Sequence, residues 1–231
     1  MKLGLWNIDH PEYHAERTSR RYQRIRDIIA FLEQQDCDVF ILTETNAALQ
    51  LPGYHVYFSA ESPYLKRSRD DHPPNRYHQV GIYSRFPIEQ MPVEEPINGV
   101  LCKCPYNNGL LWTYGNVITL KDRKKSNSMT YSKRLEEQLK VFETLTSKQF
   151  IIGGDFNMKI SWPQKRGAFR RVKGFVEQYG LIWPTETQTE SVQHVIHSPQ
   201  LAAEGSLDMS VKGRLSDHPF LRVDFHENAS A

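Results

Sequence analysis

The chain has 231 residues, of which 39% are hydrophobic and 24% charged, and its formal net charge at pH 7 is +2. This composition excludes a collagen-like, low-complexity or disordered chain, and the near balance of charges does not demand a nucleic-acid partner, so any basic binding face must come from local clustering. Three cysteines are too few for a disulfide-linked scaffold, so we expect all of them to be reduced thiols. No apolar run reaches the roughly 18 residues of a membrane-spanning helix.

Residues 1–11 lack the long apolar stretch and the small-residue cleavage site of a secretory signal peptide. Together with the reduced cysteines, this predicts a cytoplasmic protein. No Gly/Ser-rich or Pro-rich linker and no internal repeat divides the chain. We therefore expect residues 1–231 to form a single domain, and the protein to be a monomer.

The first predicted elements are a strand, a helix and a second strand. Residues 3–8 alternate apolar and other side chains, and the pattern ends at Asp9-His10-Pro11, which is typical of a strand. Apolar residues between Tyr22 and Leu32 recur at helical spacing, with arginine and glutamine between them. Residues 39–42 form a short continuous apolar run, typical of a strand buried on both faces. This order predicts a layered α/β fold.

The remainder of the chain is predicted to hold more strands and two more helices. Apolar spacing indicates helices around residues 135–145 and 169–176, the second ending at Gly180. The predicted turn at residues 153–157 follows a buried strand at 150–152. The other predicted strands are residues 55–58, 79–83, 110–114, 116–120, 195–196, 207–211 and 220–223.

Carboxylates, amides and an imidazole follow several of these apolar runs. Strand ends in layered folds meet at an open edge, and a convergence of oxygen atoms there suits a hard cation such as Mg²⁺. Each short motif alone is weak, because tight turns and strand ends use the same residue types. The four stretches are Trp6-Asn7-Ile8-Asp9, Thr43-Glu44-Thr45, Gly153-Gly154-Asp155-Phe156-Asn157 and Ser216-Asp217-His218-Pro219.

Taken in chain order, these four stretches resemble the motifs of the endonuclease/exonuclease/phosphatase superfamily. The resemblance covers nearly the whole chain, and the Gly-Asp-Phe-Asn motif at residues 154–157 is the most specific part of it. It implies a four-layer α/β/β/α sandwich, with two mixed sheets packed face to face and helices outside. It also implies Mg²⁺- or Mn²⁺-dependent hydrolysis of a phosphoester.

The same resemblance implies a metal site. Glu44 matches the metal-coordinating glutamate of the family, and Asn7 and Asp217 match residues in or near the metal shell. Asp9, in the same motif as Asn7, is a further candidate. Physical chemistry supports this assignment independently, because a bound cation polarises a phosphoryl group and neutralises the charge that develops on it.

Three further residues carry the catalytic roles that the resemblance implies. Asp155 and Asn157 orient the attacking water and contact the phosphate, together with Asn7. His218 holds a phosphoryl oxygen and stabilises the charge that develops there. A carboxylate that positions or deprotonates water is the usual general base for such a reaction.

The sequence departs from the family pattern at two places. The family usually has a His or Tyr near the end of a central strand, for which Tyr114 and Tyr131 are the alternatives. It also has an Asp that pairs with the imidazole of the Ser-Asp-His motif. Gln193 stands where that Asp belongs, and Asp208 is the alternative partner. We expect Gln193 to hydrogen-bond His218, although a neutral amide stabilises the charged imidazole less well than a carboxylate does.

Basic clusters with interleaved aromatic residues indicate the substrate class. Such clusters track a phosphate backbone, and aromatic rings stack on bases, although a basic cluster is as often a solvated helix face. The leading hypothesis is thus a metal-dependent nuclease, a phosphodiesterase acting on nucleic acid. Its rivals are a hydrolase of small phosphoesters or lipid head groups, and a catalytically weakened binding module. The candidate nucleic-acid contacts are Lys121, Arg123, Lys124, Lys125, Lys165, Arg166, Arg170 and Arg171.

Overall fold

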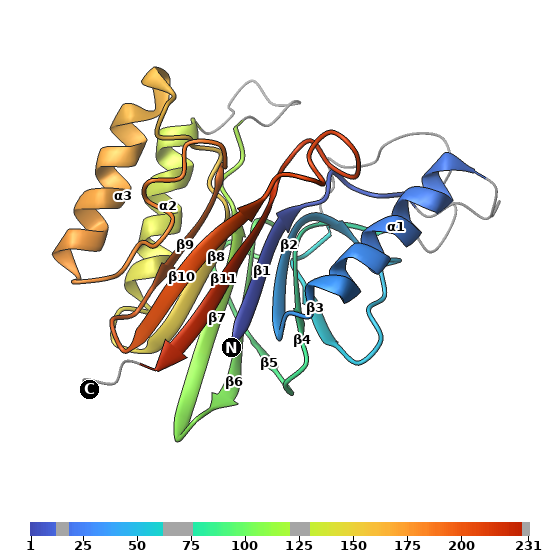
Figure 1. Cartoon of the computed structure of the whole chain (residues 1–231). Helices are drawn as coiled ribbons and strands as arrows, with labels where there is room; N and C mark the ends of the chain where they lie inside the picture. Colours follow the sequence, from blue (N-terminus) through green and yellow to red (C-terminus); the bar gives the residue numbers. More distant parts are fainter. Residues whose placement is uncertain (13–18, 62–75, 121–129, 228–231) are drawn as a thin grey trace.

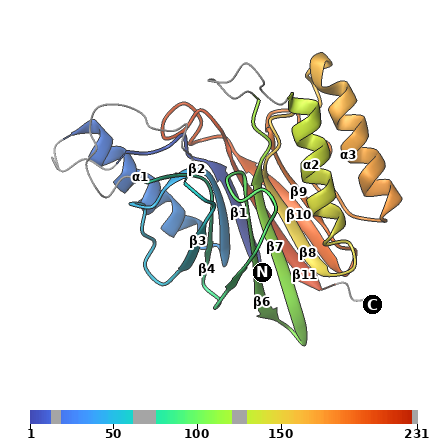
Figure 2. The same ribbon diagram turned by 180° about the vertical axis from the view of Figure 1, so that it is seen from behind.

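A computed structural model describes residues 1–12, 19–61, 76–120 and 130–227. Two mixed β-sheets lie face to face, and helices cover their outer surfaces (Figures 1 and 2). None of the helices in these ranges is long and apolar enough to cross a membrane. Cys37, Cys102 and Cys104 are buried free thiols, as expected.

The first sheet has six strands in the order β10-β11-β1-β2-β4-β3. Only β1 and β2 run parallel, and their register places Asn7 beside Thr43. The neighbouring pairs are antiparallel. The strands are β1 (Lys2–Asn7), β2 (Val39–Asn46), β3 (His55–Phe58), β4 (Tyr77–Ser84), β10 (Leu201–Asp208) and β11 (Phe220–Glu227).

The second sheet has five strands in the order β5-β6-β7-β8-β9. Here β7 and β8 run parallel, and the register places Asp155 between Val117 on β7 and Gln193 on β9. The strands are β5 (Glu89–Met91), β6 (Gly99–Tyr106), β7 (Gly109–Val117), β8 (Gln149–Asp155) and β9 (Gln193–His197).

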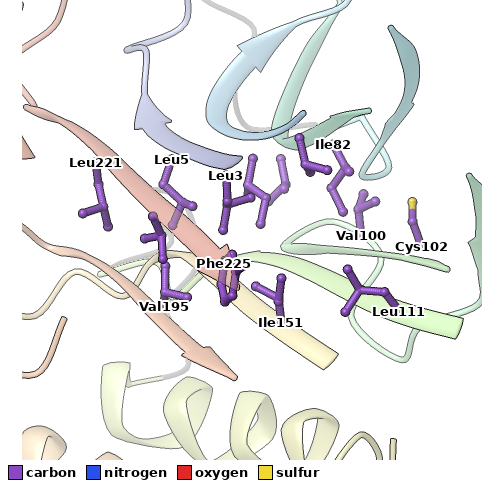
Figure 3. Close-up of a cluster of buried hydrophobic side chains, with 14 of the residues drawn as sticks. Leu3, Leu5, Ile82, Val100, Cys102, Leu111, Ile151, Val195, Leu221 and Phe225 are labelled. Carbon is purple, nitrogen blue, oxygen red and sulfur yellow. The ribbon is translucent and has the colours of Figure 1, made fainter. Parts of the chain in front are cut away.

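Apolar side chains from both sheets fill the space between them. Leu5 and Val195, from opposite sheets, lie in this central cluster (Figure 3). Helix α1 (Arg20–Gln35) packs on the outer face of the first sheet, around Trp6. Helices α2 (Tyr131–Glu143) and α3 (Arg166–Gln178) pack on the second. The predicted four-layer α/β/β/α sandwich is therefore confirmed.

Several predicted boundaries were wrong. Residues 110–114 and 116–117 of two expected strands belong to one continuous strand, β7, and residues 118–120 lie beyond its end. Strands β5 and β6 were not predicted. The expected turn at residues 153–157 begins later, because Gly153 and Gly154 continue β8. A side chain at Gly153 would lie 2.9 Å from Ile41 of the facing sheet, and one at Gly154 would lie 1.9 Å from the Asn116 carbonyl oxygen. The two glycines serve close packing rather than a turn.

Candidate active site

The polar motifs meet at one edge of the sandwich. Asn7 and Asp155 end β1 and β8, Glu44 lies near the end of β2, and the Ser-Asp-His motif lies in the loop between β10 and β11. Figure 1 shows these strand ends together at the top of the molecule. The parallel pairs β1–β2 and β7–β8 bring carboxyl ends of strands to the same edge, which is where layered folds place ligand sites.

Asn7 and Asp155 join the two sheets at the centre of this edge. The Asn7 Nδ2 atom donates a hydrogen bond of 2.9 Å to Asp155 Oδ2, and both side chains are almost completely buried. The backbone amide of Asn157 donates to Asp155 Oδ1 at 2.8 Å. These two donors hold the carboxylate in one orientation.

The surroundings of Asp155 make it a stronger base than an ordinary carboxylate. Burial raises its pKa, and the neighbouring Asp217 charge raises it further. His218 and the hydrogen bonds from Asn7 and Asn157 oppose this shift but do not cancel it. A carboxylate whose pKa is moved toward neutrality is suited to accept a proton from water.

Glu44 lies beside this pair in an acidic environment. Burial raises its pKa to about 7, and the charges of Asp155, Asp9 and Asp217 add to the shift, while a hydrogen bond from Asn7 opposes it. Repulsion among these carboxylates disfavours the ionised state in the free protein. A cation bound here would relieve that repulsion, so the electrostatics of the site fit a divalent metal.

The donor set also fits a hard cation. No group of three or more His, Cys, Asp or Glu side chains in the described ranges is close enough to hold a metal by itself. Mg²⁺ needs only one or two protein carboxylates, since water and substrate phosphate oxygens complete its shell. Glu44, with the oxygens of Asn7 and Asp217 nearby, meets that requirement and offers no sulfur ligand.

His10 is a site residue that the motifs did not reveal. Its Nε2 atom lies 3.4 Å from Glu44 Oε2, and its backbone amide donates to the Glu44 carbonyl oxygen at 2.7 Å. The imidazole is buried and packs edge-on against Tyr77. Because His10 follows the first motif directly, proximity to that motif was the only sequence signal that pointed to it.

Left-handed backbone conformations gather at this edge. Asp9, His10, Glu44 and Asn157 have φ values between 41° and 51°. Residues with side chains avoid this region, at a cost of roughly 1–3 kcal/mol each where it is strained. Such conformations cluster at functional sites, where the rest of the fold imposes them.

The loop between β10 and β11 is fastened to β1. Ser216 Oγ donates to the Asn7 carbonyl oxygen at 2.5 Å, and the Trp6 indole donates to the His218 carbonyl oxygen at 3.1 Å. The His218 Nε2 atom lies 3.3 Å from Asp217 Oδ1. The Asp217 side chain is 76% exposed and that of His218 23%, so both groups face the open edge.

Arg24, on α1, hydrogen-bonds two segments that border the site. Its guanidinium donates to the carbonyl oxygens of Ile8, Asp9 and Leu215 at 2.7, 3.2 and 2.9 Å. It therefore ties the segment after β1 to the loop that carries His218.

Gln193 does not take the place expected for it. Its side-chain amide, in the orientation that satisfies its hydrogen bonds, donates to the Leu5 carbonyl oxygen at 3.1 Å and accepts from the Asn7 backbone amide. Gln193 thus joins β9 to β1, and the expected hydrogen bond to His218 is replaced by this link. Asp208 caps a turn, since its Oδ1 accepts from the Ser210 amide at 2.8 Å.

The two alternative tyrosines lie in different places. The Tyr114 hydroxyl donates to Gln138 of α2 at 2.9 Å, in the layer between the second sheet and the helices. The Tyr131 hydroxyl donates to the Phe156 carbonyl oxygen at 2.7 Å, and the Asp155 charge contributes to its raised pKa. Of the two, Tyr131 borders the site.

The basic residues on α3 are only partly available. Arg171 Nη1 lies 2.6 Å from Glu136 Oε1, and Lys173, on the same helix, pairs with Glu186. Arg166 and Arg170 are exposed, and Lys165 is half-buried. The expected contacts at Lys121, Arg123, Lys124 and Lys125 lie outside the described residues.

The buried His194 anchors the loop that follows Asp155. Its Nδ1 atom accepts from the Trp183 indole at 3.3 Å, which leaves the Nε2 proton to donate to the Met158 carbonyl oxygen at 2.9 Å. Burial lowers the pKa of His194 to about 4. The neutral ring is therefore the form that the folded protein requires.

We expect this histidine to make stability fall in acid. In the unfolded chain His194 takes up a proton below its ordinary pKa of about 6.5, whereas the folded protein does so only near 4. Its contribution is thus complete above pH 6.5 and declines toward pH 4, by roughly 3 kcal/mol at most. Urea unfolding between pH 7 and 4 should show a smaller pH dependence for His194→Gln than for wild type. His226→Gln, at an exposed position, is the control, and equal slopes for wild type and His194→Gln would contradict the prediction.

Comparisons with known proteins agree with this fold. A search of curated proteins found no match. An endonuclease/exonuclease/phosphatase protein from Beutenbergia cavernae DSM 12333 is similar in structure, with a TM-score of 0.67 and 14% identity over 98% of this chain and 71% of that one. The endonuclease domain of TRAS1, a telomere-specific non-LTR retrotransposon, has a TM-score of 0.62 and 14% identity over 96% of each chain. D. rerio TDP2 complexed with a single-strand DNA product has a TM-score of 0.60 and 15% identity over 98% of each chain.

These structural likenesses, at such low identity, concern the fold alone. The sequence supplies the family, because residues 4–218 match the model of the Endonuclease/Exonuclease/phosphatase family. That match includes the first three polar motifs and the Ser-Asp-His residues of the fourth, and it extends over strands of both sheets. The chain therefore belongs to the endonuclease/exonuclease/phosphatase family.

Proposed function

We propose that this protein is a divalent-metal-dependent nuclease that hydrolyses phosphodiester bonds of nucleic acid. Its family consists of hydrolases, among them nucleases and phosphatases, that generally use divalent metals. The observation that carries the proposal is the buried hydrogen bond between Asn7 and Asp155, with Glu44, Asp217 and His218 gathered around it.

Glu44 would hold the metal, Mg²⁺ or Mn²⁺, with Asn7 and Asp217 beside it. The cation would polarise the phosphoryl group and neutralise the charge developing there. Zn²⁺ is disfavoured, because the site offers oxygen atoms rather than a cluster of thiolates and imidazoles.

The side chains around the metal site divide the remaining work. Asp155, held by Asn7 and Asn157, accepts a proton from the water whose oxygen attacks phosphorus. The bond from phosphorus to the leaving oxygen breaks in the same reaction, and that oxygen takes up a proton from solvent. Asn157 contacts the phosphate. His218 donates a hydrogen bond to a phosphoryl oxygen, which stabilises the negative charge that accumulates in the transition state.

A substrate panel tests the function. Purified protein with Mg²⁺ or Mn²⁺ should cleave single-stranded or nicked oligonucleotides faster than it hydrolyses small phosphate monoesters or phosphodiesters. Preference for the small compounds would support the rival phosphoesterase. Binding of oligonucleotides without hydrolysis of any compound would support the binding module. The TDP2 relative was solved with a single-strand DNA product, which favours nucleic acid as the first class to test.

Salt dependence tests the nature of the partner. Each Lys or Arg that contacts a single strand contributes about 0.7 to the slope of log affinity against log salt. Replacing Lys121, Arg123 and Lys124 by glutamine should therefore reduce the slope by about two, if all three contact phosphates.

The matched control removes the same number of positive charges at the edge of the sandwich away from Asp155. Lys2 begins β1, Lys148 directly precedes β8, and Lys140 lies in the last turn of α2. Glutamine at these three positions should leave the slope unchanged. Equal slopes for the two triple variants would favour the small-phosphoester rival.

A further inference from the structure

Lys165 lies directly before α3, and its ammonium packs on Tyr131, which borders the site. It ends the short 3₁₀-helix η1 (Pro163–Lys165), directly before α3. Its ammonium lies 3.0 Å from the centre of the Tyr131 ring. The amino-terminal ends of α2 and α3, where these two residues lie, are at the same edge as the end of β8 (Figures 1 and 2).

Tyr131 connects this ammonium to the catalytic loop. Its hydroxyl donates to the carbonyl oxygen of Phe156, the residue between Asp155 and Asn157. The ring is therefore held against that loop, and the Lys165 ammonium packs on its face. None of the hydrogen bonds or ion pairs among the described residues joins Lys165 to Glu44, Asp155 or His218, so its connection to the site runs through Tyr131.

The ammonium lacks an acidic partner in the described ranges. Arg171 and Lys173, on the following helix, form ion pairs with Glu136 and Glu186. No carboxylate among the described residues lies within ion-pair distance of Lys165. The aromatic ring compensates only part of the lost hydration of a cation. Burial consequently lowers the pKa of Lys165 to about 8. An anionic oxygen bound beside it would supply the missing counter-charge.

We propose that Lys165, supported by the Tyr131 ring, binds a phosphate of the nucleic-acid strand that flanks the reacting phosphodiester. This inference rests on the proposed nuclease function and names one contact that positions the strand. A flanking contact contributes to affinity for a chain of nucleotides but not to hydrolysis of a single isolated phosphodiester.

The test measures both consequences. Binding of a fluorescently labelled single-stranded oligodeoxynucleotide, measured by anisotropy in EDTA to prevent cleavage, should weaken about tenfold in Lys165→Met, the scale of one charge-assisted hydrogen bond. The salt slope should fall by about 0.7. Hydrolysis of bis(p-nitrophenyl) phosphate with Mn²⁺ should stay at the wild-type rate. Lys165→Arg should retain most of the affinity, and Lys173→Met, which removes a paired charge nearby, should bind as wild type does.

The outcomes separate this inference from the proposed function. If wild type cleaves the oligonucleotide while Lys165→Met binds it with wild-type affinity and slope, the inference is overturned and the nuclease function stands. An equal loss of bis(p-nitrophenyl) phosphate hydrolysis would also overturn it, because the residue would then act on the reacting group or on the fold. If wild type neither binds nor cleaves the oligonucleotide, the nuclease function fails and the inference fails with it.

Discussion

Asp155→Asn should lower the rate of hydrolysis by on the order of 10²–10⁴, the usual contribution of a positioned acid–base group. Asparagine cannot accept the proton of the attacking water, although it is nearly the same size as aspartate. The fold should survive, because burial already raises the pKa of Asp155 and so disfavours its charged form. Initial rates on the best substrate of the panel, at saturating metal, measure the effect, and thermal unfolding confirms that the variant is folded.

Asp208→Asn is the matched control for this substitution. Asp208 lies at the end of β10, where its Oδ1 accepts from the Ser210 amide, a hydrogen bond that asparagine retains. We expect a near-native rate. A large loss in Asp208→Asn would mean that Asp208 is the partner of His218 after all. Near-native turnover in Asp155→Asn would refute the catalytic assignment of Asp155.

Removal of the divalent metal should abolish hydrolysis, and Glu44→Gln should make its restoration much less efficient. EDTA should stop the reaction, and added Mg²⁺ or Mn²⁺ should restore it in wild type. Glutamine removes the charge that compensates a cation but keeps the size of the side chain, so the metal concentration needed for half-maximal rate should rise at least tenfold, equivalent to about 1.4 kcal/mol of binding free energy.

Direct metal binding separates this effect from a general loss of activity. Mn²⁺ binding followed by electron paramagnetic resonance should weaken in Glu44→Gln and remain unchanged in Glu33→Gln, a control on the exposed surface of α1. Full activity of wild type in EDTA would overturn the metal assignment altogether. Unchanged Mn²⁺ affinity in Glu44→Gln would move the site away from Glu44.

Local patterns in the sequence were sufficient to predict most of the elements. The apolar spacing between Tyr22 and Leu32 predicted a helix, and these residues lie in α1. The apolar run at residues 39–42 predicted a strand, and it lies in β2. The three-residue edge strand β5 was missed because so short a segment carries no periodicity. The Gly153-Gly154 pair was misinterpreted as a turn because glycine pairs are common in turns. Here the absence of side chains lets Ile41 of the facing sheet and the Asn116 backbone of β7 approach closely. Such contacts leave no trace in local sequence.

By itself, the sequence determined the family, the layered fold and the positions of the candidate site, because strand ends with polar motifs are local features. Only the tertiary structure decided which of those residues meet. Asn7 reaches Asp155 across 148 positions of sequence, Gln193 binds β1 instead of His218, and Tyr131 borders the site while Tyr114 faces α2. These outcomes follow from strand order and register, which depend on how distant segments pair and pack rather than on the periodicity of any one segment.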